Sequence, residues 1–93
     1  MGYVFEWDVK KAELNLKKHG VGFDEASTVF GDPLALLMPD PEHSVDEIRY
    51  VLLGMSNRQS LLVVAFAERP PRTRLISARR ATRQERKKYE EDK

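Results

Sequence analysis

The sequence predicts a single α+β domain, residues 1–93, in which helices pack on a mostly antiparallel sheet. Three observations favour this class. A chain of 93 residues is long enough for one domain but not for two. Its first third shows helical spacing interrupted by glycine, and the remainder consists mainly of short apolar runs separated by turn residues. The expected order of elements is therefore β-α-α-β-β-β-β-α.

The first strand and the first helix are predicted from the first twenty residues. Residues 3–7 alternate large and polar side chains, as in a short strand. Asp8 is a suitable N-cap for a helix over residues 9–18, and Gly20 can end that helix in the left-handed conformation. The residues expected on the buried face of this helix are Val9, Ala12 and Leu16.

A second helix and an edge strand are expected next. Helical spacing runs from residue 23 or 24 to Phe30, and Gly31 follows as a stop signal. Residues 34–38 form a short apolar run that is closed by two prolines, and this pattern favours the edge of a sheet.

Three longer strands follow in the second half of the chain. They are predicted over residues 47–55, 61–67 and 73–78. The second of these runs is apolar on both faces, which predicts the central position in the sheet. In the turn before it, Asn57 is the residue best suited to a positive φ. Strict alternation along the last strand would place Arg74 on the face of Ala78, opposite Leu75.

The last predicted element is a polar helix. Thr82 and Glu85 have the spacing of a capping box, which opens a helix that continues to about Glu91. Tyr89 is its only large apolar side chain. Because so polar a helix gains little from burial, we expect its cap, its i,i+4 pairs or a partner to hold it.

Composition excludes several classes of function. The chain has no cysteine, which excludes disulfides and thiolate catalysis, and it lacks the motifs of zinc proteases, P-loop enzymes and serine hydrolases. No apolar stretch approaches the ~18 residues that a membrane span needs. The N-terminus does not resemble a signal peptide. We therefore expect a cytoplasmic protein with no membrane contact, metal site or cofactor.

Charge is distributed unevenly along the chain. Residues 1–57 contain 5 Lys and Arg against 10 Asp and Glu, whereas residues 72–93 contain 9 against 4. Such polarity is typical of a polyanion site at one end of a molecule, but a solvated basic helix would produce the same pattern.

Two clusters of basic residues are candidates for chemistry. Lys18 and His19 end the first helix, where cations complement the helix dipole, and where a histidine could also exchange a proton near neutral pH. Arg79 and Arg80 lie where the last strand meets the N-terminus of the capped helix. Guanidinium groups beside free backbone N–H groups can hold a phosphate. The alternative is a junction of ion pairs with acidic residues of the first half.

Two segments together resemble the BrnT family of type II toxins. The first is Phe5-Glu6-Trp7-Asp8 with Asn15 and Lys18-His19-Gly20-Val21, and the second is Ile76-Ser77-Ala78-Arg79-Arg80-Ala81-Thr82. The resemblance covers almost the whole chain and implies a RelE-like fold and a ribonuclease toxin that halts translation. It also implies neutralisation by a BrnA-type ribbon-helix-helix antitoxin, expected in a heterotetramer that contacts DNA only through the antitoxin.

The expected mechanism is cleavage of RNA without a metal ion. Arg79 and Arg80 are predicted to contact the scissile phosphate, and Lys18 and His19 are the candidate acid and base. The residues predicted to follow the neighbouring RNA backbone are Arg58, Arg74 and Arg83. The expected substrate is RNA, either free or associated with the ribosome. Two alternatives remain open at this point, a protein that binds RNA or the ribosome without cleavage and a module that binds only another protein.

Overall fold

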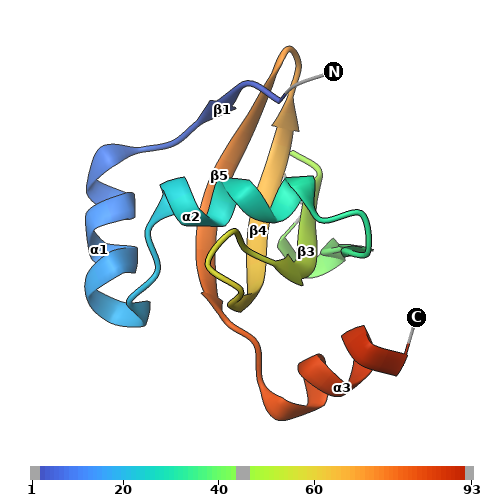
Figure 1. Ribbon diagram of the computed structural model, residues 1–93. Helices are drawn as coiled ribbons and strands as arrows, with labels where there is room; N and C mark the ends of the chain where they lie inside the picture. The colour runs from blue at the N-terminus through green and yellow to red at the C-terminus, as the bar shows by residue number, and fades with distance from the viewer. Residues whose placement is uncertain (1–2, 44–46, 92–93) are drawn as a thin grey trace.

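The computed structural model describes residues 3–43 and 47–91, and it confirms the α+β class and the predicted order of the main elements (Figure 1). The strands are β1 (Phe5–Glu6), β2 (Leu36–Pro39), β3 (Arg49–Met55), β4 (Leu61–Arg69) and β5 (Arg72–Arg80). The helices are α1 (Val9–His19), α2 (Phe23–Thr28) and α3 (Arg83–Glu91). Two 3-10 turns, η1 (Val29–Gly31) and η2 (Pro41–His43), flank β2.

The five strands form one sheet in the order β1-β5-β4-β3-β2. All neighbouring strands are antiparallel except β1, which runs parallel to β5. The apolar strand β4 is in the middle and β2 is at an edge, as the sequence predicts. Because β1 pairs only with Thr73 and Arg74, no strand of the described chain lies beside the later part of β5 on that side.

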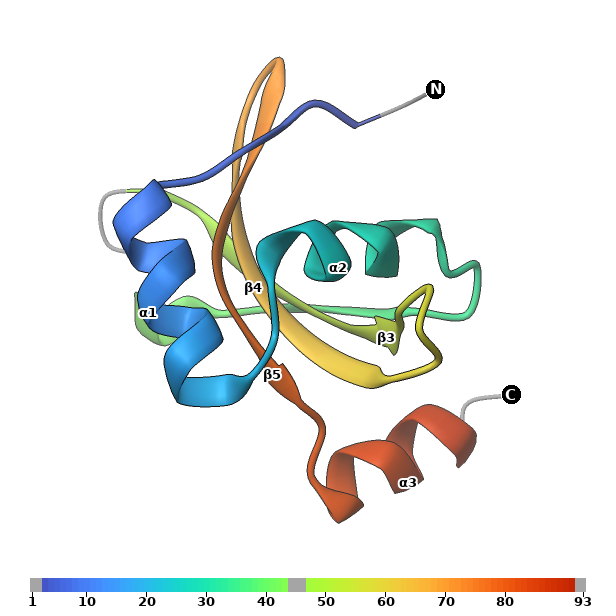
Figure 2. The ribbon, with the colours of Figure 1, turned by 60° about the vertical axis from the view of Figure 1, so that its left-hand side comes forward.

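The sheet has a hydrophobic cluster on each face. On one face, residues of α2 such as Phe23 and Ala26 pack with Leu62, Val64 and Leu75 of the sheet, and Ala12 of α1 packs against this cluster. On the other face, Tyr89 of α3 packs with Leu53, Leu61 and Val63. The chain therefore forms three layers, with α1 and α2 on one side of the sheet and α3 on the other (Figure 2).

The predicted buried face of α1 is correct at Ala12, which packs against the core, but wrong at Val9 and Leu16. Val9 is 67% exposed and Leu16 is 54% exposed, whereas Asn15 is buried. Asn15 faces the sheet because its amide makes hydrogen bonds that an apolar side chain could not make there. Helix α1 is therefore oriented with the polar Asn15 towards the sheet and with two large apolar residues, Val9 and Leu16, at the surface.

The predicted faces of β5 are also partly wrong, because the strand contains an irregularity. Phe66 pairs with Leu75 and Ala65 pairs with Ser77, so the pairing shifts by one residue at this point. Such a bulge reverses the alternation along the strand that carries the extra residue. Leu75 and Ala78 consequently belong to the same cluster, and Arg74 lies on the opposite face.

The turn between β3 and β4 also differs from the prediction. The residue with a positive φ, 61°, is Gln59 and not Asn57. Asn57 instead donates its backbone N–H to the hydroxyl of Thr28, and Ser56 donates its hydroxyl to the carboxylate of Glu25. These bonds hold the turn against α2, so contacts from a distant element decide which residue takes the left-handed conformation.

Helix α3 is docked through Tyr89 rather than through its polar surface alone. The Tyr89 hydroxyl donates to Asp32 Oδ2 at 2.6 Å, and the backbone N–H of Met55 donates to the same oxygen at 2.8 Å. Burial and this carboxylate raise the pKa of Tyr89 to about 12. The hydroxyl thus stays protonated and keeps its bond to Asp32 throughout the neutral range.

Candidate functional site

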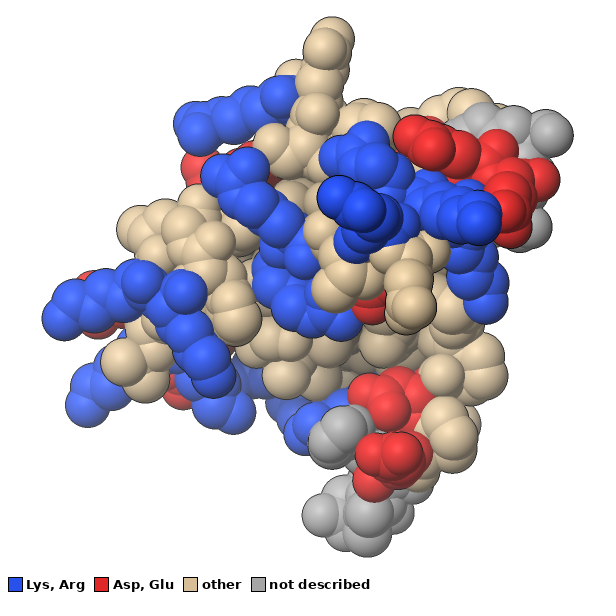
Figure 3. All heavy atoms as spheres, turned by 90° about the horizontal axis from the view of Figure 1, so that it is seen from below, with Lys and Arg blue, Asp and Glu red and all other residues tan. Residues whose placement is uncertain are grey.

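The last turn of α1, the end of β5 and the beginning of α3 lie toward the same end of the molecule (Figures 1 and 2). Figure 3 views the molecule from this end, and Lys and Arg side chains form a broad band across it, with the larger visible groups of Asp and Glu at the upper right and near the lower edge. The uneven charge of the sequence therefore corresponds to a basic surface at this end of the molecule.

Helix α1 brings Lys18 and His19 to this end. Asp8 caps the helix by accepting from the backbone N–H of Lys11 at 3.0 Å. Gly20 ends it with φ 71°, and its N–H donates to the carbonyl of Leu16 at 2.8 Å. The two predicted residues consequently occupy the last turn, where the negative end of the helix dipole favours cations.

Asn15 fixes the position of α1 along β5. Its amide nitrogen donates to the carbonyl of Ala78 at 2.8 Å and to that of Val21 at 3.0 Å. Its amide oxygen accepts from the N–H of Ala78 at 3.1 Å. Asn15 thereby provides hydrogen-bond partners for the N–H and the carbonyl of Ala78, which lies in β5 beyond the residues that pair with β1. This role is not apparent from the sequence, in which the one signal is a polar residue on the helix face that also carries Ala12 and His19.

From this anchor, both His19 and Arg80 lie further along the direction that α1 and β5 share. Helix α1 and strand β5 run in the same direction (Figures 1 and 2). Four helical residues beyond Asn15 advance ~6 Å, and two strand residues beyond Ala78 advance ~6.6 Å. In addition, Lys18 and His19 line a shallow groove of about 230 Å³ with Ile76 and Ser77 of β5.

Arg79 and Arg80 point to opposite faces of β5. Arg80 pairs in register with Leu62, which belongs to the cluster under α1 and α2. Arg79 pairs with Val63, which belongs to the cluster under α3. The prediction that both guanidinium groups contact the same phosphate is therefore not supported, because side chains alternate across a strand.

The guanidinium of Arg79 also forms an ion pair with a carboxylate. It makes a two-pronged ion pair with Glu85, with distances of 2.8 Å to Oε1 and 2.9 Å to Oε2. Glu85 belongs to the predicted capping box, in which Thr82 N–H donates to Glu85 Oε1 and Glu85 N–H donates to the Thr82 hydroxyl. Arg79 consequently lowers the pKa of Glu85 to about 2, and the pair raises the pKa of Arg79. This arrangement orients the start of α3 relative to β5.

Replacement of Glu85 by Gln tests the pair by its pH dependence. Because the pKa of Glu85 falls from 4.5 to about 2 in the folded protein, the carboxylate stabilises the fold fully above pH 4.5 and ceases to do so as the pH approaches 2. We expect Glu85→Gln to lose about 1–2 kcal/mol at pH 7, since solvent screens a partly exposed pair. This loss should shrink towards zero near pH 2.

Urea unfolding at several pH values measures this difference. Glu90→Gln is a matched control, because Glu90 lies 3.9 Å from Arg86 in an exposed pair on the same helix. We expect the control to change stability by less than about 0.5 kcal/mol at every pH. A Glu85→Gln penalty that is the same at pH 7 and pH 2.5 would show that the ion pair does not stabilise the fold.

The remaining predicted residues lie in three different places. Arg74 is on the α3 side of the sheet and is 3.2 Å from Glu6, so it forms one of the ion pairs that the alternative interpretation expected. Arg58 is exposed on the β3–β4 turn, at the end of the sheet where β5 stops. Arg83 is exposed as the first residue of α3, three positions after Arg80. Neither Arg80 nor Arg83 forms an ion pair within the part of the chain that the structure describes.

Lys18 and His19 thus lie in the last turn of α1, Arg80 at the end of β5, Arg83 at the start of α3 and Arg58 on the β3–β4 turn. Among the described residues, there is no group of three or more His, Asp or Glu side chains arranged to hold a metal ion. Within the same residues, no helix is both long and apolar enough to cross a membrane.

Comparison with known families identifies the family of this chain. Residues 7–85 match the family model described as the ribonuclease toxin BrnT of type II toxin–antitoxin systems. The chain belongs to the BrnT family. The match includes α1, the whole sheet after β1 and the capping box, so it spans every element of the basic end except most of α3.

A solved structure supports the fold. The chain is similar to the crystal structure of the Brucella abortus ribonuclease toxin BrnT, with a TM-score of 0.68 and 22% sequence identity. The similarity covers 88% of this chain and 100% of the Brucella chain. No curated protein matches the chain at a significant level. BrnT membership means that the chain is a toxin of a ribonuclease family that is paired with an antitoxin.

Proposed function

We propose that this BrnT chain cleaves RNA without a metal ion and thereby inhibits translation. The observation that carries the proposal is the anchoring of α1 by Asn15 to Ala78, two residues before Arg80, with Lys18 and His19 lining a groove against β5. Lys18, Arg80 and Arg83 are cationic, so they attract the RNA phosphate and repel a divalent ion.

Cleavage of this kind needs three functions around one phosphate. A base removes the proton of the 2′-hydroxyl, and the 2′-oxygen then attacks phosphorus. Cations stabilise the additional negative charge of the phosphorane, and an acid protonates the departing 5′-oxygen. The products are a 2′,3′-cyclic phosphate and a 5′-hydroxyl. Electrostatic stabilisation of the phosphorane is expected to be the largest contribution.

Each residue near the groove has a proposed role in this scheme. Arg80 contacts the scissile phosphate, because it is exposed, forms no ion pair in the described chain and lies two residues beyond Ala78, to which α1 is anchored. His19 and Lys18 are the acid and base candidates. Arg83 and Arg58 follow the neighbouring backbone of the RNA.

Two of the predicted residues receive revised roles. Arg79 positions α3 through Glu85, and it places Arg83 through that helix. Arg74 is held by Glu6 on the opposite face of the sheet, so its proposed role is to stabilise the junction of β1 and β5. Neither residue contacts the scissile phosphate in this scheme.

Purified protein and a labelled RNA test the proposal. We expect defined fragments that end in a 2′,3′-cyclic phosphate, formed at equal rates in EDTA and in Mg²⁺. The rate should fall steeply as salt is raised from 50 to 200 mM, because phosphate contacts release counterions. Cleavage that requires Mg²⁺ would contradict the metal-independent scheme. RNA that is retained on the protein but remains intact in both buffers would instead support a binding function without cleavage.

His19→Gln tests the acid–base role. We expect the cleavage rate at pH 7 to fall by about 10²-fold, a typical effect of removing a general acid or base. The dependence of the rate on pH between 5 and 8 should also become flatter. If the variant keeps the wild-type rate and the wild-type pH profile, His19 serves only to end α1.

We also propose the nature of the partner. A BrnA-type antitoxin, a dimeric ribbon-helix-helix protein, is proposed to bind two toxin chains in a heterotetramer and to contact DNA. Membership in a toxin–antitoxin family supports the existence of an antitoxin. The mass of the complex purified from cells that express both genes tests the stoichiometry.

A further inference from the structure

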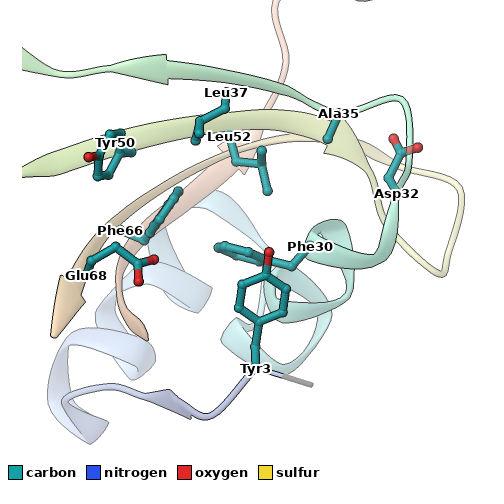
Figure 4. A pocket seen from close by; sticks show the side chains of 9 residues that line it. All are labelled: Tyr3, Phe30, Asp32, Ala35, Leu37, Tyr50, Leu52, Phe66 and Glu68. Carbon is teal, nitrogen blue, oxygen red and sulfur yellow. The ribbon is translucent and has the colours of Figure 1, made fainter. Parts of the chain in front are cut away.

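A second concave region lies away from the basic end. It is an open pocket of about 420 Å³ beside η1, on the face of the sheet that carries α1 and α2. Its walls include Phe30, Tyr50 and Phe66, with Leu37 and Tyr3 at the rim (Figure 4). Pockets of this size commonly hold a ligand or a large side chain.

The aromatic walls of the pocket support one another. Phe66 lies between the other two rings, 4.9 Å from Phe30 in an edge contact and 5.6 Å from Tyr50 in a stacked contact. Tyr3 makes a further edge contact with Phe30 at 5.1 Å. These contacts hold the aromatic walls in place before anything binds, which lowers the entropy cost of binding.

The rim leaves large apolar side chains in solvent. Leu37 is 60% exposed and Tyr3 is 56% exposed, and both line the pocket. A contiguous apolar surface with a polar border is typical of a site for another protein. Aromatic residues are also enriched among those that supply most of the binding energy at interfaces.

The charge around the pocket is acidic. Among the residues that the structure describes, the charged ones that line it are Asp32 and Glu68, and none is Lys or Arg. Residues 20–48, which supply four of the lining residues, contain no Lys or Arg and have seven carboxylates. These are Asp24, Glu25, Asp32, Asp40, Glu42, Asp46 and Glu47. The segment that supplies these lining residues is thus opposite in net charge to the C-terminal segment proposed to bind RNA.

The two carboxylates of the pocket differ in how many hydrogen bonds they already accept. Asp32 already accepts hydrogen bonds from the N–H groups of Leu34 and Met55 and from the Tyr89 hydroxyl. Glu68 is exposed, and the bond it accepts is a long one of 3.4 Å from the hydroxyl of Thr73. Glu68 is therefore the carboxylate that can bind an incoming cation.

We propose that this pocket is the docking site of the antitoxin. A large apolar side chain of the antitoxin enters between Phe30, Tyr50 and Phe66, and an adjacent Lys or Arg pairs with Glu68. The acidic surroundings favour a basic polypeptide and repel RNA. This inference rests on the proposed pairing with an antitoxin and adds to it the surface and the chemistry of recognition.

The experiment measures Kd for the purified full-length chain and the antitoxin encoded beside it, by titration calorimetry. We expect Leu37→Arg to raise Kd by about 30-fold or more, because it removes an apolar contact and introduces a like charge next to the incoming cation. Glu68→Arg should raise Kd by about 10-fold. Both positions are exposed, so the melting temperatures should stay near that of the wild type.

Two controls make the result specific. Leu34→Arg changes a residue that is 52% exposed just before β2 but does not line the pocket, and it should leave Kd within about threefold of the wild-type value. RNA cleavage by the free Leu37→Arg and Glu68→Arg proteins should remain within about twofold of wild type, because the pocket and the basic end share no residue.

The outcomes separate this inference from the function proposed above. A tight wild-type complex that tolerates both pocket substitutions would overturn the docking site alone. Pocket variants that bind the antitoxin normally but cleave RNA poorly would assign the pocket to the substrate and overturn the inference. A wild-type chain that does not bind the antitoxin at all would overturn the pairing and the docking site together, while leaving RNA cleavage intact.

Discussion

Arg80→Ala is expected to reduce the rate of RNA cleavage by about 10²–10³-fold, the usual effect of removing a group that stabilises charge in the transition state. Arg80 is exposed at the end of β5 and forms no ion pair among the described residues, so its charge is available to a phosphate. For the same reason, the free energy of unfolding should change by less than about 0.5 kcal/mol. Single-turnover cleavage of a labelled RNA measures the rate, and urea unfolding measures the stability.

Arg72→Ala is the matched control for Arg80→Ala. Arg72 begins the same strand, is also exposed and lies at the opposite end of the sheet, with its guanidinium 3.9 Å from Glu6. We expect this variant to cleave RNA within about threefold of the wild-type rate. Equal losses in both variants would mean that general positive charge, rather than the position of Arg80, determines cleavage.

Asn15→Ala is expected to have the largest effect on stability. The substitution leaves two carbonyls and one N–H of the backbone without the partners that Asn15 provides, at Val21 and Ala78. Each unsatisfied buried group costs about 1–3 kcal/mol, and water entry should recover part of this, so we expect a total loss of about 3 kcal/mol. The melting temperature of a domain of this size should fall by at least about 12 °C.

The neighbouring residue provides the control for Asn15→Ala. Leu16 is larger and more apolar than Asn15, but it is 54% exposed. Leu16→Ala should therefore cost less than about 1 kcal/mol. If Leu16→Ala is the more destabilising of the two variants, the orientation of α1 described above is incorrect.

The strands and the caps were predictable because their signals are local. The apolar run at 61–67 indicated a central strand, and β4 is the middle strand of five. The spacing of Thr82 and Glu85 indicated a capping box, and both of its reciprocal hydrogen bonds are present. Gly20 and Asp8 likewise end and begin α1 as expected. Each of these features depends on residues within a few positions of one another.

The errors arose where a distant element determines the outcome. Asn15 turns inward because β5 has unpaired backbone groups, which the pattern of α1 does not reveal. The bulge opposite Ala65 and Phe66 reverses the faces of β5, and nothing in residues 73–78 signals it. Tyr89 was recognised as the only large apolar residue of its helix, but its partner Asp32 lies 57 positions earlier.

The candidate site remains a prediction, and the structure changes how its residues are grouped. Lys18 and His19 line a groove with Ile76 and Ser77 of β5, and Arg79 and Arg80 lie on opposite faces of the end of that strand. The sequence did not indicate that Glu85 would also pair with Arg79, because the spacing of a capping box specifies only the bonds between Thr82 and Glu85. The consequence is that the phosphate contact is assigned to Arg80 and the orientation of α3 to Arg79.

The most direct test of where RNA binds is a titration followed by two-dimensional ¹⁵N NMR. The probe is a short RNA with 2′-O-methyl groups, which binds but cannot be cleaved because its 2′-oxygens carry no proton. We predict the largest shifts at Lys18, His19, Arg80 and Arg83, and these shifts should weaken as salt is raised. Shifts that centre on Arg49 and Arg74, across the sheet on the face that α3 partly covers, would contradict the site proposed here.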